Sequence, residues 1–187
     1  QLRKRDGFDE TYPLYDMTFN AYPLKSSDVV KGVGMGYGHE LMKKMKQLGA
    51  LLLASEMAGV SERAMYETVE YTKQRKQFGV EIARFQALKH MAADMYLLVE
   101  STKSAIEYAA WAVEAGDEEA ELAVSIAKSY ASKASKKVTA DAIQMHGGIG
   151  FTWESDVHLF FKRASRSAAL LGDAYEHNEK IAQMVID

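Results

Sequence analysis

The distribution of proline constrains this chain more than any other feature. Only two prolines occur among 187 residues, Pro13 and Pro23, and none follows. Because proline breaks a helix in its interior, the chain after Pro23 is free to form long helices. Apolar residues there recur at steps of three and four, the period of a helix with one buried face. The sequence therefore predicts a mainly helical protein.

Turn-forming residues divide this proline-free stretch into four helical segments. Glycines and charged residues at the ends mark the boundaries. The expected helices cover residues 40–75, 85–115, 118–146, and a segment from 154 or 155 to the end, with a break at Gly172–Asp173. Four long helices joined by short turns predict an all-α fold, an up-down-up-down four-helix bundle with a short N-terminal β-strand remnant.

The periodicity also predicts which side chains are buried. In the first helix the expected apolar side is Leu41, Met45, Leu48, Leu52, Gly59 and Met65. In the second helix the expected seam is Leu88, Met91, Met95, Leu98, Thr102, Ala105 and Ala109. The third helix is rich in Ala and Ser, and such small side chains predict close packing between helices.

The first thirty residues have a different character. The stretch 11–22 is rich in aromatic residues and alternates loosely, so we expect one or two edge strands there. The glycine-rich run 32–38 then reads as a connection. It gives little support to a dinucleotide-binding fingerprint, because a long helix follows and no parallel strand returns.

Composition excludes several classes of function. The chain has no Cys, which excludes a disulfide scaffold, an iron–sulfur cluster and a Cys nucleophile. A net charge of -3 gives no support to nucleic acid or an anionic membrane as partner. Neither a membrane-spanning apolar run nor a secretory signal is evident, so we expect a cytoplasmic protein. Because the chain starts at Gln1 and its first Met is Met17, we also expect a piece of a longer product.

Metal and hydrolase sites are also not predicted. The five histidines are His39, His90, His146, His158 and His177. Their spacing matches no metal-ligand motif, and we expect no metal. The pattern G-x-S-x-G of hydrolase nucleophiles does not occur either.

Two short motifs are candidates for ligand binding. Arg75-Lys-Gln-Phe-Gly79 joins a guanidinium, an amide and an aromatic ring, which suit a pyrophosphate and a stacked ring. In Gln144-Met-His-Gly-Gly-Ile-Gly-Phe151, adjacent glycines allow a backbone to approach another molecule closely. Each motif is also explained by a helix C-cap, and for Arg75–Gly79 spacing alone favours the cap. Neither motif by itself establishes a binding site.

Together and in this order, the motifs resemble the acyl-CoA dehydrogenase family. The matching pieces are 71–79, 85–90, 93–95, 144–154 and 158–163. The resemblance covers nearly the whole chain but only the C-terminal half of a family enzyme. It implies that residues 1–31 are the end of the middle β domain and that residues 32–187 are the C-terminal four-helix bundle domain.

The resemblance implies a flavoenzyme that binds FAD and oxidises an acyl-CoA between its α and β carbons. A carboxylate removes the α proton, and the β hydrogen leaves as hydride to the flavin. It further implies a homo-oligomer, dimer or tetramer, and electron-transfer flavoprotein as acceptor. The implied cofactor-binding residues are Arg75, Gln77, Phe78, Gln144, Gly147, Gly148 and, less clearly, Gln86.

The sequence departs from the family at the catalytic base. One position where family enzymes place a Glu falls at Leu171 or Gly172, and the other falls at Gly49. None of these can accept a proton. Asp173, one or two residues further on, is the preferred substitute. Glu56 shares the helix face of Gly49 but lies roughly 10 Å from it along the axis.

Three functions therefore stay open. The first is an acyl-CoA dehydrogenase whose base has shifted to Asp173, unless that residue only caps the last helix. The second is a non-catalytic partner, a scaffold subunit of a heteromer in which a related subunit supplies the base. The third is other flavin chemistry on the same fold, such as that of a nitroalkane oxidase or a flavin monooxygenase.

Overall fold

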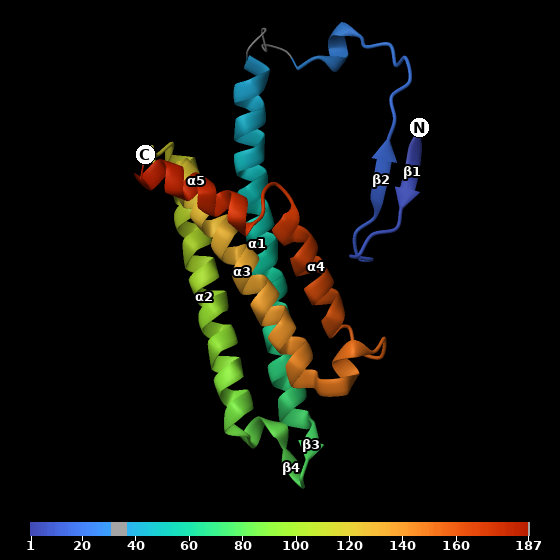
Figure 1. The fold of residues 1–187 in the computed structure, drawn as a ribbon, viewed down its shortest axis with the longest axis vertical. Helices are drawn as coiled ribbons and strands as arrows, with labels where there is room; N and C mark the ends of the chain where they lie inside the picture. The colour runs from blue at the N-terminus through green and yellow to red at the C-terminus, as the bar shows by residue number, and fades with distance from the viewer. Residues whose placement is uncertain (31–36, 187) are drawn as a thin grey trace.

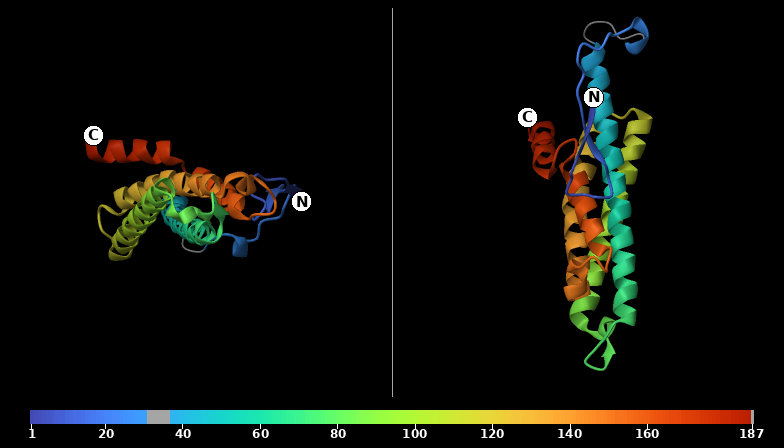
Figure 2. Two further views of the ribbon diagram at one scale, coloured as in Figure 1. Left: turned by 90° about the horizontal axis from the view of Figure 1, so that it is seen from below. Right: turned by 90° about the vertical axis from the view of Figure 1, so that its right-hand side faces the viewer.

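The computed structural model describes residues 1–30 and 37–186 and is mainly helical (Figure 1). Its long helices are α1 (Tyr37–Gln74), α2 (Gln86–Ala115), α3 (Ala120–His146), α4 (Val157–Ala169) and α5 (Ala174–Ile186). Helices α1 to α4 lie lengthwise beside one another, whereas α5 is turned across them (Figure 2). The predicted all-α bundle with a strand remnant is confirmed.

The helices end close to the predicted residues. Gly116, with φ of 67°, adopts the left-handed conformation that closes α2. The expected break in the last segment separates α4 from α5, where Leu171 has φ of 55° and Gly172 has φ of 99°. Two adjacent residues with positive φ turn the chain sharply, so that α5 leaves the direction of α4.

Helix α3 is the centre of the bundle and contacts the other four long helices. Its buried side chains are mostly small: Ala123, Ser125, Ala127, Ala131, Ser132, Ala134, Ser135 and Ala142. Because these side chains are short, neighbouring helices approach closely. The prediction of close packing around this helix is confirmed.

The predicted seam of α2 is confirmed, but that of α1 is largely wrong. In α2, Met95 and Ala109 are fully buried. In α1, by contrast, Met45, Leu48 and Leu52 are 57%, 48% and 70% exposed. The residues of α1 that are buried include Ala50, Leu51, Ala54, Met57 and Ala58. The alanines fit against α3, so the larger apolar side chains remain outside.

Two small strand pairs accompany the helices. β1 (Leu2–Arg5) pairs antiparallel with β2 (Leu14–Met17), and β2 lies within the stretch predicted to form strands. β3 (Lys76–Gln77) and β4 (Val80–Glu81) form a hairpin that was not predicted. Its turn holds Gly79, so this glycine does not cap α1 as expected. Most of the glycine-rich run 32–38 lies outside the described residues.

Lys128, in the middle of α3, connects α3 to the break between α4 and α5. Its side chain is fully buried. Its ammonium donates hydrogen bonds to Ala168 O at 3.0 Å, Gly172 O at 2.8 Å and Ser132 Oγ at 3.2 Å. These bonds satisfy carbonyls at the end of α4 and thereby hold the loop that follows. Burial lowers the pKa of Lys128 to about 8.

Among the described residues, no helix is long and apolar enough to cross a membrane.

The low pKa of Lys128 makes stability depend on pH. Between about pH 8 and the usual lysine pKa of 10.5, the unfolded chain holds this proton more tightly than the folded chain. The free energy of unfolding should therefore rise with pH across this window through this group. Lys128→Met should abolish that rise. At pH 7 it should also cost roughly 1–3 kcal/mol, because the carbonyls lose their donor.

Urea denaturation from pH 7 to 10.5 measures both effects. Lys133→Met, at an exposed position on the same helix, is the matched control and should retain the pH-dependent rise. An unchanged pH profile in Lys128→Met would show that Lys128 is not the group responsible.

Candidate functional site

Five of the predicted cofactor-binding residues lie around one open hollow at the end of the bundle. Arg75 follows α1, Gln77 lies in β3, and Gln144, Gly147 and Gly148 lie where α3 passes into the 3-10 turn η3 (Gly147–Phe151). All five line a hollow of about 400 Å³. The two motifs are far apart in the sequence, and the fold joins them into one site.

Aromatic stacking joins the two sides of this hollow. The rings of Tyr71 and His146 are stacked with centroids 4.2 Å apart and an angle of 18° between planes. The Tyr71 hydroxyl donates to His146 O at 3.3 Å. This contact holds the end of α3 against the end of α1. Sequence reasoning did not assign either residue to the site, although Tyr71 lies one helical turn before Arg75.

The glycines of the 144–151 motif have two different structural roles. Gly147 has φ of 64°, and a Cβ added to Gly147 or Gly148 would meet nothing within 4 Å. Their backbone therefore faces open space and is accessible to a ligand. A Cβ on Gly150 would lie 2.7 Å from Ile143 O, so this glycine is required for packing.

Two predicted residues do not join this hollow. Phe78 is 91% exposed at the tip of the β3–β4 hairpin, where its ring meets that of Phe85 edge-on. Gln86 begins α2, and its side-chain nitrogen lies 3.5 Å from His90 Nε2. Within this chain, neither side chain lines the hollow that contains Arg75 and Gln144.

Of the positions expected to carry the base, Leu171 or Gly172 in the loop and Gly49 in the helix, Leu171 and Gly49 meet in space. The side chain of Leu171 packs directly on Gly49 of α1, so that a Cβ at Gly49 would overlap Leu171 Cδ1. Leu171 also holds φ of 55°, a conformation that is costly for a branched side chain. The family resemblance expects a carboxylate either in this loop or on this helix. Here an apolar side chain, that of Leu171, lies between the two.

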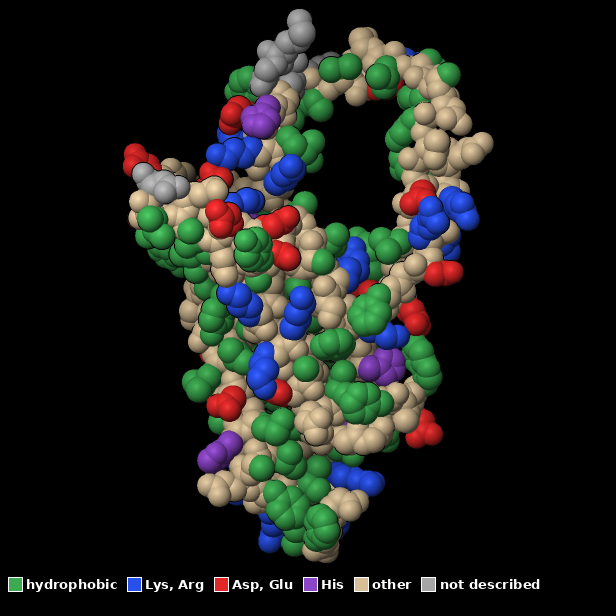
Figure 3. Space-filling model, in the orientation of Figure 1, with side chains coloured by type: hydrophobic (Ala, Val, Ile, Leu, Met, Phe, Trp, Pro, Cys, Tyr) green, Lys and Arg blue, Asp and Glu red, His purple; other side chains and the backbone are tan. Residues whose placement is uncertain are grey.

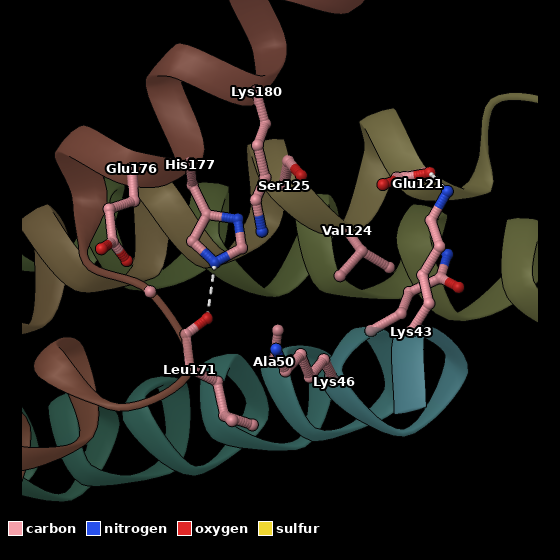
Figure 4. Close-up of a pocket in the computed structure, with 12 residues that line it drawn as sticks. Lys43, Lys46, Ala50, Glu121, Val124, Ser125, Leu171, Glu176, His177 and Lys180 are labelled. Atoms are coloured by element: carbon pink, nitrogen blue, oxygen red, sulfur yellow. Dashed lines mark hydrogen bonds and ion pairs between the residues drawn. The ribbon is translucent and has the colours of Figure 1, made fainter. Parts of the chain in front are cut away.

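A second hollow of about 280 Å³ opens beside Leu171, between α1, α3 and α5 (Figure 4). Lys43, Lys46 and Lys180 line it, and Lys43 pairs with Glu121 at 2.7 Å. His177 is 2% exposed, and its Nε2 lies 3.1 Å from Leu171 O. Because a carbonyl oxygen can only accept, Nε2 donates this hydrogen bond. Burial, above all, lowers the pKa of His177. His177 therefore helps to hold Leu171 in place.

The two substitute carboxylates are both engaged in other contacts. Asp173 Oδ1 accepts hydrogen bonds from the backbone nitrogens of Glu176 at 2.9 Å and Tyr175 at 2.8 Å, which caps α5. The bond from Glu176, above all, lowers the pKa of Asp173. Glu56 Oε1 accepts from Arg163 Nη1 and from Ser167 Oγ, both at 3.0 Å.

Among the described residues, no cluster of His, Asp and Glu is placed to hold a metal ion.

Comparison with known proteins identifies the family. The family model for the acyl-CoA dehydrogenase C-terminal domain matches residues 36–185. The acyl-CoA dehydrogenase IpdE2 of Mycolicibacterium smegmatis is 36% identical over 179 residues, which are 92% of this chain and 55% of that protein. The chain belongs to the acyl-CoA dehydrogenase family and spans about half the length of this relative.

Solved structures show the same fold. Butyryl-CoA dehydrogenase from Megasphaera elsdenii superposes with a TM-score of 0.89 at 25% identity, over 99% of this chain and 48% of that one. The ChsE4–ChsE5 complex of Mycobacterium tuberculosis superposes with a TM-score of 0.88 at 24% identity, over 100% of this chain and 49% of that one. The helical domain described above is thus a fold of this family.

Proposed function

We propose that this chain is the C-terminal half of a subunit of an FAD-dependent acyl-CoA dehydrogenase. In this proposal it binds the FAD of a neighbouring subunit but does not supply the catalytic base. The base comes from a sequence-related partner subunit. The observation that carries the proposal is the packing of Leu171 on Gly49. The family resemblance expects a carboxylate at Gly49 or at one of the adjacent residues Leu171 and Gly172, and none of the three can accept a proton.

The hollow at Arg75 fits the phosphate-bearing part of FAD. The Arg75 guanidinium can form charge-assisted hydrogen bonds to a pyrophosphate, and the Gln144 amide can donate beside it. The open backbone at Gly147 and Gly148 allows close approach of the cofactor. When bound, FAD would accept the hydride that leaves the β carbon of the acyl-CoA.

The distance along α1 explains why two subunits are needed. Gly49 and Arg75 are 26 positions apart, which corresponds to roughly 39 Å along a helix at 1.5 Å per residue. This separation is longer than an extended FAD molecule. A cofactor held at Arg75 therefore cannot react beside Leu171 of the same chain. The hollow at Arg75 therefore serves the active site of a neighbouring subunit, and this requires a dimer or a tetramer.

The exposed surface also fits an oligomer. Leu48, Leu52, Tyr108 and Trp111 are each about half exposed or more. Such apolar surface is favourably covered by further subunits. Acyl-CoA is the proposed substrate, and electron-transfer flavoprotein is the proposed acceptor. The similarity in fold to the ChsE4–ChsE5 complex supports an assembly of related subunits.

A second candidate is a dehydrogenase that uses Asp173 as its own base. It is favoured by the position of Asp173 directly after Gly172, in the loop expected to carry the base. The capping bonds to Tyr175 and Glu176 oppose it, because they engage the carboxylate at the start of α5. Asp173→Asn separates the candidates, since Asn also caps a helix but cannot act as a base.

The cofactor role of Arg75 predicts a loss of flavin on substitution. In the complete protein, Arg75→Gln should weaken FAD binding roughly 10- to 100-fold, the range expected for loss of a charged hydrogen bond. The dissociation constant is measured by flavin fluorescence. Arg84→Gln is the control, because Arg84 lies at the same end of the bundle, is exposed and pairs with Glu81. Equal FAD binding by both variants would contradict the proposed role of Arg75.

The base proposal predicts a gain of function. Leu171→Glu places a carboxylate beside Gly49, and the complete protein without its partner should then reduce a dye acceptor with acyl-CoA. The wild-type protein alone should not. Leu170→Glu, one residue away, is the matched control and should remain inactive. Activity in the wild-type protein alone that is lost in Asp173→Asn would instead support the second candidate.

A further inference from the structure

The N-terminal strand pair is attached to the bundle through one arginine of α4. Arg163 Nε lies 2.8 Å from Asp9 Oδ2, and its Nη2 donates to Thr11 O at 3.1 Å and to Thr11 Oγ1 at 2.6 Å. Its Nη1 donates to Glu56 of α1 at 3.0 Å. One guanidinium therefore joins three segments: the β1–β2 loop, α1 and α4.

This contact is buried, although the strands around it are exposed. The side chain of Asp9 is 1% exposed and that of Arg163 is 22% exposed. Every residue of β1 and β2 is exposed to solvent. Figure 3 shows an opening between the N-terminal segment and the start of α1. The loop between the strands is thus the place where this segment is fixed to the helices.

Neighbouring side chains of α4 add to the same contact. Lys162 pairs with Glu10 at 3.2 Å, and the guanidinium of Arg166 lies 3.6 Å from the centre of the Tyr12 ring. An acidic and aromatic loop therefore meets a basic face of α4. Arg163 uses Nε, Nη1 and Nη2 for different partners, and Arg166 stacks on a ring. Such planar contacts of arginine fix direction as well as distance, which a simple attraction of charges does not.

The attachment involves α1, which carries Gly49, and α4, which precedes the loop that carries Leu171. In α1, Glu56 follows Gly49 by about two helical turns. Arg163 lies in α4, and Leu171 follows it by a similar number of residues, in the loop after that helix. A shift of the N-terminal segment on Arg163 therefore also shifts that segment relative to the Leu171–Gly49 contact.

We propose that Arg163 is a positioning residue that sets the placement of the N-terminal β portion on the helical bundle. This inference rests on the proposed function and adds that the part preceding α1, which the resemblance assigns to the end of the middle β domain, helps to place the flavin and the acyl-CoA. In this inference Arg163 needs no contact with either of them. It acts through Asp9 and Thr11, and it fixes the geometry in which hydride transfer takes place.

Two variants test this role in the complete enzyme with its partner. Arg163→Gln removes the contacts of the guanidinium of Arg163, and Asp9→Asn removes only the charge on the N-terminal side. Because a misplacement of about 1 Å can cost up to about 100-fold in rate, both should lower kcat by tenfold or more. KM for acyl-CoA should change by less than about twofold. Arg163→Lys, which keeps the charge but loses the fork, should lie between the wild type and Arg163→Gln.

Hydrogen exchange provides a readout that does not need activity. In Arg163→Gln and Asp9→Asn, the backbone amides of residues 2–17 should exchange faster, while those of α2 and α3 should keep their protection. Arg63→Gln is the control, because it breaks only an exposed ion pair with Glu67 on α1. It should alter neither kcat nor exchange in residues 2–17.

The outcomes separate this inference from the proposed function. Unchanged exchange in residues 2–17 would overturn the attachment through Arg163. Faster exchange with an unchanged kcat would overturn its positioning role. If the wild-type enzyme with its partner does not oxidise acyl-CoA, the proposed function fails, and the positioning role fails with it. The exchange measurement would still decide whether Arg163 attaches the segment.

Discussion

The close packing of small side chains along α3 determines how the rest of the structure is arranged. Most of the side chains that α3 buries are alanine or serine, and these short residues allow four other helices to approach it closely. The buried ammonium of Lys128 sits within this packing and binds the carbonyls of Ala168 and Gly172. It thereby fixes the α4–α5 loop, while His177 holds Leu171 O from the other side. The result is that Leu171 lies on Gly49.

The two ends of the bundle have different chemistry. At one end a guanidinium, amides and an accessible glycine backbone form a hollow suited to an anionic cofactor. Near the other end, where the family resemblance expects a proton acceptor, the chain places leucine against glycine. The two substitute carboxylates, Asp173 and Glu56, already accept hydrogen bonds that stabilise the fold. This asymmetry is best explained by a subunit that helps to bind a cofactor and leaves proton abstraction to its partner.

Much of this could be predicted from the sequence, because helix boundaries and the cofactor motifs depend on local signals. Glycines and the absence of proline placed the helices to within a few residues. The resemblance identified Arg75 and Gln144 as parts of one site, and the structure brings them together. The exposed side of α1 was mispredicted because apolar residues occur on several of its faces, so that periodicity alone did not select Ala50 and Ala54 over Leu48. The contacts Leu171–Gly49 and Arg163–Asp9 join residues more than a hundred positions apart, and no local pattern predicts them.

The most direct test of the account is an anaerobic titration of the purified complete protein with acyl-CoA, followed by visible absorption of the flavin. It is carried out on this subunit alone and on the complex with a sequence-related subunit that co-purifies with it. The account predicts that the flavin absorption bleaches in the complex and stays unchanged in the subunit alone. Full bleaching by the subunit alone would contradict it, because that chain would then contain its own catalytic base.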